Sequence, residues 1–222
     1  MLMPEQRTKL DPTDDALFYD LPRFVTHVDD PFIARLTELY RDRLTPKSRI
    51  LDLMSSWVSH LPDDVAFSHV EGHGLNAAEL AKNPRLDHYI VQNLNDNPVL
   101  PYADGEFAAV LNCVSVQYLQ YPDRIFAEVA RVLQPGGIVI ISFSNRMFYQ
   151  KAIAAWREGS ESSRVQLVQR YIRAIPDFTD PEVITHVAAA PALLQLLGMG
   201  GSDPFYAVVA TKRSPKIHRE GE

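Results

Sequence analysis

The sequence predicts an α/β protein built around a mostly parallel sheet, and two observations point to this class. Segments of strand length alternate with segments of helical periodicity along most of the 222-residue chain. Several of the strand segments are apolar throughout, which is typical of strands covered on both faces. The length suits one domain of generous size, or one domain with a small extra module. In such folds ligands bind beyond the carboxyl ends of the strands.

Helical periodicity and end signals locate the predicted helices. Asp30 followed by Pro31 is typical of an N-cap and first helical turn. Asn76 with Glu79 three residues later is typical of a capping box. Residues 135–137, Pro-Gly-Gly, form a stop signal for the helix that precedes them. The predicted helices cover residues 31–44, a short stretch after Asn76, and residues 122–133, 147–158 and 162–175.

Short apolar runs bounded by turn residues locate the predicted strands. The run at residues 138–143 is almost wholly apolar and β-branched, as expected of a central strand. The predicted strands cover residues 49–54, 65–70, 89–92, 108–116, 138–143 and 205–210. The loops after residues 53, 70, 92, 113 and 142 are therefore where functional side chains are expected.

Composition excludes several classes of protein. The 28 acidic and 22 basic residues give a net charge of −6, which argues against a strongly basic nucleic-acid binder. The single cysteine, Cys113, excludes an intramolecular disulfide or a zinc site of several thiolates. No apolar stretch approaches the roughly 18 residues of a spanning helix, and residues 1–15 lack the apolar core of a secretory signal. We therefore expect a cytoplasmic protein that is not an integral membrane protein.

One stretch of sequence carries a specific family signature. Residues 126–141, FAEVARVLQPGGIVII, contain the pattern E-x-x-R-V-L-x-P-G-G before a buried strand. On this basis the chain resembles the class I S-adenosylmethionine-dependent methyltransferases that modify small molecules. Weaker similarities to the same family lie at residues 50–53, 72–76, 100–102, 105–107 and 205–212. The resemblance implies a Rossmann-like, doubly wound sheet of seven strands, with an antiparallel last strand and helices on both faces.

The resemblance implies a cofactor site that this sequence alters. The family places a glycine-rich loop after the first strand, because backbone atoms there approach the methionine part of the cofactor. Met54, Ser56 and Val58 occupy the three glycine positions here. Gly74 occupies the position of the acidic residue that binds the ribose hydroxyls, and Asn93 stands where an Asp near the adenine is common. The glycine loop is thus degenerate, while the scaffold is not.

The resemblance also assigns candidate residues to the two halves of a site. The cofactor candidates are Asp52, Met54, Ser55, Ser56, Glu71, Gly72, His73, Asn93, Leu94 and Asn112. The candidates for contact with the methyl acceptor are Phe18, Tyr19, Gln117, Tyr118, Asn145 and Arg146. Residues 1–30 are expected to form an N-terminal segment that covers the substrate, residues 31–212 the methyltransferase-like domain, and residues 213–222 a flexible tail. No residue is assigned as catalytic.

Two functions from different classes remain open at this point. The first is a methyltransferase that uses S-adenosylmethionine and acts on a small or lipophilic acceptor by in-line transfer. The second is a non-catalytic relative that serves as a binding or regulatory module, which the altered glycine loop favours. A nicotinamide-dependent enzyme is disfavoured because no glycine occurs between Leu53 and Gly72. A metal site at His69 and His73 is disfavoured because four residues of strand separate the rings by about 13 Å.

Overall fold

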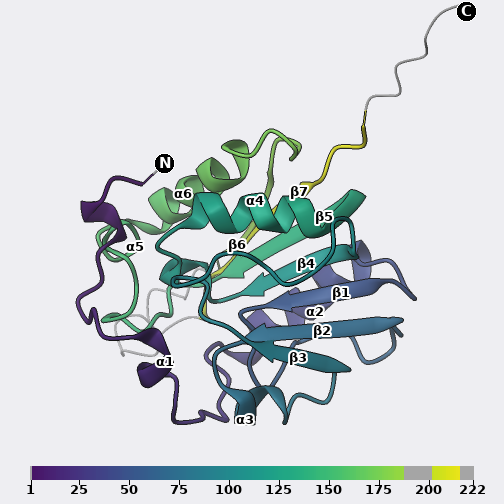
Figure 1. Ribbon diagram of the computed structural model, residues 1–222, viewed down its shortest axis with the longest axis horizontal. Coiled ribbons are helices and arrows are strands. Elements are labelled where there is room, and N and C mark those ends of the chain that lie inside the picture. The colour runs from purple at the N-terminus through teal and green to yellow at the C-terminus, as the bar shows by residue number, and fades with distance from the viewer. Residues whose placement is uncertain (1, 188–201, 216–222) are drawn as a thin grey trace, which may run out of the picture.

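The computed structural model describes residues 2–187 and 202–215, which form a seven-stranded sheet with helices on both faces (Figure 1). The strands are β1 (Arg49–Leu53), β2 (His69–Gly74), β3 (His88–Val91), β4 (Phe107–Cys113), β5 (Leu133–Phe143), β6 (Glu182–His186) and β7 (Phe205–Thr211). Their order in the sheet is β3-β2-β1-β4-β5-β7-β6. Strands β1 to β5 are parallel, and β7 runs antiparallel to both of its neighbours. The predicted fold class is confirmed.

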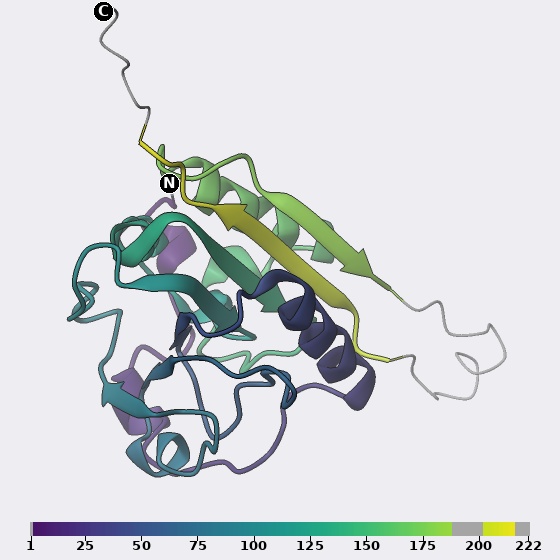
Figure 2. The same ribbon diagram turned by 90° about the vertical axis from the view of Figure 1, so that its right-hand side faces the viewer.

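Two apolar layers hold the helices against the sheet. Along β1, Ile50 packs with α2 (Asp30–Arg43), whereas its neighbour Leu51 packs on the opposite face. This alternation follows from the two-residue repeat of a strand. The opposite face carries α4 (Pro122–Val132), α5 (Ala154–Arg157) and α6 (Glu161–Arg173), whose buried side chains form the larger of the two clusters. Figure 2 shows α2 lying against one side of the sheet, with β6 and β7 at its edge.

Side-chain caps fix the starts of two helices, one at the predicted Asn76 and the other at Asp29, where the sequence predicts Asp30. Asp29 accepts a hydrogen bond from the backbone N–H of Phe32 at 3.0 Å and opens α2. Asn76 accepts from the N–H of Glu79 at 3.0 Å and opens α3 (Ala77–Leu80). The capping box is half formed, because the carboxylate of Glu79 turns away to other partners.

The second strand lies further along the chain than predicted. Residues 65–68 form a loop that runs beside the start of β1, where Lys47 N–H donates to the carbonyl of Ala66 and Ser68 N–H donates to the carbonyl of Ser48. The strand itself, His69–Gly74, has the sequence HVEGHG, and its two glycines and charged side chains hide its strand character. Glu71, Gly72 and His73 therefore lie within β2 and not in the turn that follows it.

Three further predictions are corrected. The helix predicted over 147–158 is reduced to α5, because three backbone groups of this segment bond to other elements: Phe148 N–H donates to the Tyr118 hydroxyl, Ile153 N–H to the Gln117 carbonyl and Ala154 N–H to the Thr8 carbonyl. The edge strand β6 was missed, since its side chains are mostly exposed and form no apolar run. Helix α4 ends at Val132, and the Pro-Gly-Gly segment falls in the irregular start of β5.

The N-terminal segment is anchored to the body of the protein. It comprises a 3-10 turn η1 (Glu5–Arg7), α1 (Asp15–Phe18) and the extended chain that runs to α2. The ammonium group of Lys151, fully buried, donates to the carbonyl of Thr13 at 2.6 Å and lies 3.2 Å from Asp11 and 3.5 Å from Asp15. The segment passes along the edge where the parallel strands end (Figure 1). In the described part of the chain, no helix is long and apolar enough to cross a bilayer.

Candidate active site

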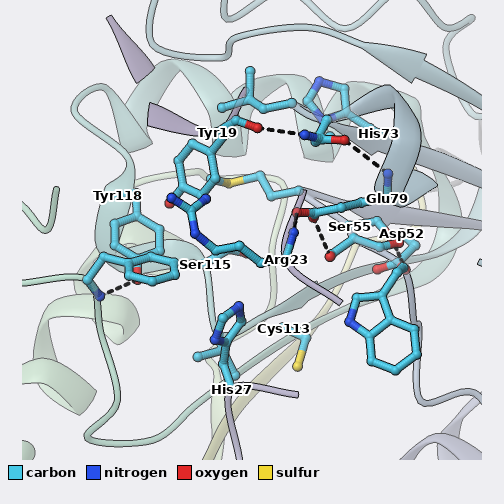
Figure 3. A pocket seen from close by; sticks show the side chains of 18 of the residues that line it. Tyr19, Arg23, His27, Asp52, Ser55, His73, Glu79, Cys113, Ser115 and Tyr118 are labelled. Carbon is cyan, nitrogen blue, oxygen red and sulfur yellow. Dashed lines mark hydrogen bonds between the residues drawn. The ribbon is translucent and has the colours of Figure 1, made fainter. Parts of the chain in front are cut away.

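A cavity of about 450 Å³ lies at the carboxyl ends of the parallel strands. It is lined by residues that follow β1, β2, β3, β4 and β5 and by the N-terminal segment between Asp15 and Val28. Strand β1 has β2 on one side and β4 on the other, so the strand order reverses beside this cavity. Both the volume and the position are those of a small-molecule site. Figure 3 shows the side chains that converge on it.

Backbone strain gathers around this cavity. Met54, at the end of β1, has φ of +59°, a left-handed conformation that glycine adopts more easily than any other residue. In the described residues four non-glycine positions have positive φ, and three of them, Met54, His60 and Val114, line the cavity. Strained conformations of this kind cluster at functional sites. The chain thus keeps the glycine-like geometry of the loop after β1 although Met54 carries a side chain.

Asp52 places a buried carboxylate under the loop after β1. The residue is 4% exposed, and its Oδ2 accepts hydrogen bonds from the hydroxyls of Ser55 and Ser59, both at 2.6 Å. Burial raises the pKa of Asp52 to about 6, and the two hydroxyl donors offset part of that rise. A nearby cation would favour the ionised form of this group.

Glu79 supplies a second buried carboxylate, which the sequence reasoning recognised as a helix cap but not as a site residue. It is 8% exposed and lines the cavity from α3. One oxygen accepts from the backbone N–H of Arg23 at 2.7 Å and the other from the hydroxyl of Ser56 at 2.6 Å. Glu79 therefore joins the loop after β1 to the N-terminal segment (Figure 3).

The end of β2 cannot carry the acidic side chain that the resembling family has there. A Cβ added to Gly74 would lie 2.5 Å from the carbonyl oxygen of Ser55. The same loop is held close by Ser55 N–H, which donates to the carbonyl of His73 at 2.6 Å. Glu79, five residues further along the chain, is a buried carboxylate that lines the same cavity.

His73 faces the cavity with both of its ring nitrogens unpartnered among the described residues. It is 1% exposed, and burial lowers its pKa to about 4, so the ring is neutral at pH 7. The hydroxyl of Ser115, beyond β4, is likewise buried without a protein partner in this part of the chain. Buried polar groups are normally hydrogen-bonded, so both mark places where a polar ligand is expected.

The opposite half of the cavity is aromatic. Tyr118 and Phe148 stack at 6.1 Å between ring centroids with an interplanar angle of 30°. Tyr19 lies edge-on to both, at 6.4 Å from Tyr118 and 6.1 Å from Phe148. His27 meets Phe148 edge-on at 5.1 Å, and burial lowers the pKa of His27 below its usual 6.5. This half has the flat apolar walls that favour a ring-shaped or lipophilic ligand.

The structure brings many of the predicted site residues to one cavity. The predicted residues that line it are Asp52, Met54, Ser55, Ser56, His73, Asn93, Leu94, Tyr19, Tyr118 and Arg146. Those that do not line it are Glu71, Gly72, Asn112, Phe18, Gln117 and Asn145. Glu71 is instead paired with His69 at 2.9 Å and His88 at 2.8 Å. Asn112 and Gln117 are buried, each with its amide donating to a backbone carbonyl, and Asn145 is exposed.

The sequence reasoning missed Arg23, His27, Asn95 and Ser115 as well as Glu79. Arg23 and His27 stand in a segment with neither helical nor strand periodicity, so the sequence gives no sign of where they lie. The structure shows that this segment lines the cavity at the ends of the strands. Trp57 also lies at the cavity wall and donates its indole N–H to the carbonyl of Val25 at 3.2 Å. Within the described residues no group of three or more metal-ligating side chains is found.

A family model described as "Methyltransferase domain" matches residues 60–141. Norajmaline N-methyltransferase of Rauvolfia serpentina is 34% identical over 71 residues, which are 32% of this chain and 24% of that protein. The biotin biosynthesis bifunctional protein BioHC of Teredinibacter turnerae is 24% identical over 103 residues, which are 46% of this chain and 18% of that protein. The chain thus spans less than a quarter of the length of the curated relatives it matches.

Solved structures share the fold at low sequence identity. Geranyl diphosphate C-methyltransferase from Streptomyces coelicolor has a TM-score of 0.53 at 17% identity, covering 81% of this chain and 76% of that one. The cyclase SpnF has a TM-score of 0.51 at 19% identity and covers 81% of each chain. The strand order and these matches confirm the resemblance: the chain has the fold of the class I S-adenosylmethionine-dependent methyltransferases.

Proposed function

We propose that the protein transfers the methyl group of S-adenosylmethionine to a small or lipophilic acceptor. The observation that carries the proposal is the cavity at the sheet's switch point, with two buried carboxylates, Asp52 and Glu79, along one half and aromatic rings along the other. A divided cavity of this kind suits a polar cofactor beside an apolar acceptor.

The polar half fits the groups that the cofactor presents. Asp52 would face its amino group, since an ionised carboxylate stabilises a neighbouring ammonium ion. Glu79 would accept hydrogen bonds from the ribose hydroxyls in place of the carboxylate that Gly74 lacks. Asn93 and Leu94, after β3, would contact the adenine, and an amide side chain can both donate and accept there.

Bound S-adenosylmethionine supplies a sulfonium methyl group, whose transfer is an in-line displacement that leaves a neutral thioether. The contribution of this chain is alignment and exclusion of water. Residues 1–30 would act as a cover over the acceptor: Trp57 holds Val25, and Glu79 holds the backbone of Arg23. These two bonds tie the proposed cover to the loops that would hold the cofactor.

Thermal unfolding in the presence of S-adenosylhomocysteine tests the proposal directly. A ligand at about 100 times its Kd adds roughly 2.7 kcal/mol to the stability of the folded protein. We expect a higher melting temperature in wild type and a smaller rise in Asp52→Ala. An unchanged melting temperature at millimolar S-adenosylhomocysteine would contradict the proposal.

A non-catalytic binding or regulatory module is the second candidate, and one feature favours it. The hydroxyls of Ser55 and Ser59 already satisfy Asp52, so the loop after β1 is hydrogen-bonded to itself. A module of this kind would bind neither S-adenosylmethionine nor S-adenosylhomocysteine, or would bind them without methylating any acceptor. A panel of small amines, phenols and carboxylic acids assayed for S-adenosylhomocysteine release separates the two candidates.

A further inference from the structure

The guanidinium group of Arg23 stands among aromatic rings at the cavity wall. Its Cζ lies 4.7 Å from the ring centroid of Phe18, 5.3 Å from that of Phe148 and 5.7 Å from that of Tyr19. Contacts of this kind stabilise a cation without neutralising its charge. Arg23 therefore brings a full positive charge to the aromatic half of the site (Figure 3).

No carboxylate of the described residues lies within ion-pair distance of this guanidinium. Its Nη2 donates to the carbonyl of Phe18 at 3.0 Å, whereas Nη1 is buried without any hydrogen-bond partner in the described part of the chain. A charged donor that is buried and unpaired raises the free energy of the folded state. An anionic ligand group would remove this penalty.

The acidic residues that line the same cavity already have other partners. Asp15 accepts from Lys9 at 2.5 Å and lies 3.5 Å from Lys151. Glu79 accepts from the hydroxyl of Ser56 and from the backbone N–H of Arg23, not from its side chain. The second arginine at the cavity, Arg146, is paired with Asp203 at 2.7 Å. Arg23 is thus the arginine that remains available for a ligand among these lining residues.

We propose that the methyl acceptor is a flat aromatic or lipophilic carboxylic acid whose carboxylate pairs with Arg23. The rings of Tyr19, Tyr118 and Phe148 provide the apolar walls, and the unpartnered Nη1 group of the guanidinium provides a charged donor for a carboxylate. The inference rests on the proposed function, because it assigns the aromatic half of the cavity to the acceptor. The polar half with Asp52 and Glu79 is left to the cofactor.

The test uses two probes of equal shape, 2-naphthoate and 2-naphthamide, with the full-length protein. Binding is followed by ligand-observed NMR with and without saturating S-adenosylhomocysteine. We expect the acid to bind roughly tenfold more tightly than the amide, because hydrogen bonds between charged groups are stronger than those to neutral ones. Equal binding of acid and amide by the wild type would overturn the proposal, and this comparison requires no variant.

Two variants and a control test whether the preference for the acid over the amide depends on Arg23. Arg23→Met and Arg23→Gln should lose the preference for the acid, whereas Arg35→Met, an exposed arginine of α2, should keep it. Retention of the preference in both Arg23 variants would overturn the proposal.

The methionine part of the cofactor also has a carboxylate. A separate comparison tests whether Arg23 binds that carboxylate and not the one of the acceptor. S-adenosylhomocysteine has that carboxylate and 5′-methylthioadenosine lacks it. If Arg23→Met weakens binding of the first and not of the second, Arg23 serves the cofactor and the acceptor assignment is overturned. If naphthoate binds through Arg23 while S-adenosylhomocysteine does not bind at all, the proposed function fails and the carboxylate site stands.

Discussion

The two halves of the cavity differ in how their charges are balanced. In the half beside β1 and β2, Asp52 and Glu79 are each bonded to serine hydroxyls of the same loop. In the half beside β4 and β5, Arg23 is surrounded by rings and has no carboxylate partner among the described residues. The two carboxylates of the first half are therefore already hydrogen-bonded, whereas Nη1 of Arg23 in the second half has no hydrogen-bond partner among the described residues.

This difference implies different costs of binding. A cofactor that enters the first half must replace hydrogen bonds that Ser55, Ser56 and Ser59 already make, so its net gain is reduced. A ligand that enters the second half meets apolar rings and a cation that has no carboxylate partner among the described residues. The structure therefore predicts modest affinity for the cofactor and strong chemical selection of the acceptor.

Replacement of Lys151, the buried cation that anchors the N-terminal segment, should have the largest effect on the free energy of unfolding. Lys151→Met leaves Asp11 and Asp15 without their fully buried cation and the carbonyl of Thr13 without its donor. Loss of one partner of a buried ion pair costs about 3–5 kcal/mol of unfolding free energy. Urea unfolding measures this loss, with the exposed Lys82→Met as the matched control. Equal stability of the two variants would show that the N-terminal segment is not anchored by this ion pair.

The pH dependence of stability tests the buried carboxylate of the polar half. Because the folded-state pKa of Asp52 is about 6 and its ordinary value is 3.8, the folded protein binds more protons than the unfolded chain between these values. The free energy of unfolding should therefore fall as pH rises from 4 to 7, by about 3 kcal/mol relative to Asp52→Asn. Urea titrations across this range supply the comparison, with the exposed Asp42→Asn as the control. Parallel curves for wild type and Asp52→Asn would contradict the assignment.

Glu79 should matter for the cofactor more than for stability. If it holds the ribose hydroxyls, Glu79→Gln weakens S-adenosylhomocysteine roughly tenfold, the effect of losing one charged hydrogen-bond acceptor. Isothermal calorimetry at pH 7.5 measures the change, and the exposed Glu158→Gln should bind as wild type does. Unchanged affinity in Glu79→Gln would leave Glu79 as a structural link between the loop and Arg23.

Substitution of Met54 should have the smallest effect, and Lys47 provides a closely matched control position. Its φ of +59° is nearly that of Lys47, at +61°, which lies outside the cavity. Glycine relieves about 1 kcal/mol of strain at such a position, partly offset by its greater freedom in the unfolded chain. Met54→Gly and Lys47→Gly should thus change stability alike, while Met54→Gly alone raises affinity for S-adenosylhomocysteine. Equal affinities in the two variants would show that the Met54 side chain does not restrict the cofactor.

Much of the fold could be predicted because the relevant signals are local. The cap at Asn76 and the apolar run of β5 depend on neighbouring residues and appear where the pattern indicates, and the cap of α2 lies at Asp29, one residue before the predicted Asp30. Strand β2 was displaced in the prediction because HVEGHG has little strand propensity, and its pairing with β1 and β3 is set by distant residues.

The candidate site was predictable in part for the same reason. Asp52, Ser55 and Asn93 follow strands directly, so strand ends alone located them. Arg23 and Glu79 reach the cavity through bonds between segments 56 residues apart, which no local pattern reveals. The positive φ of Met54 was likewise hidden, because sequence indicates the loss of glycine but not whether the backbone keeps its conformation.

The central claim is that S-adenosylmethionine binds in the polar half of this cavity. Amide NMR of the labelled protein, titrated with S-adenosylhomocysteine, tests it most directly because it reports the location of binding. We expect chemical-shift changes that saturate at Ser55, Ser56, Asn93 and Ser115, with little change at the far end of the sheet around Arg49 and His69. No change at millimolar ligand, or changes confined to residues away from these loops, would contradict it.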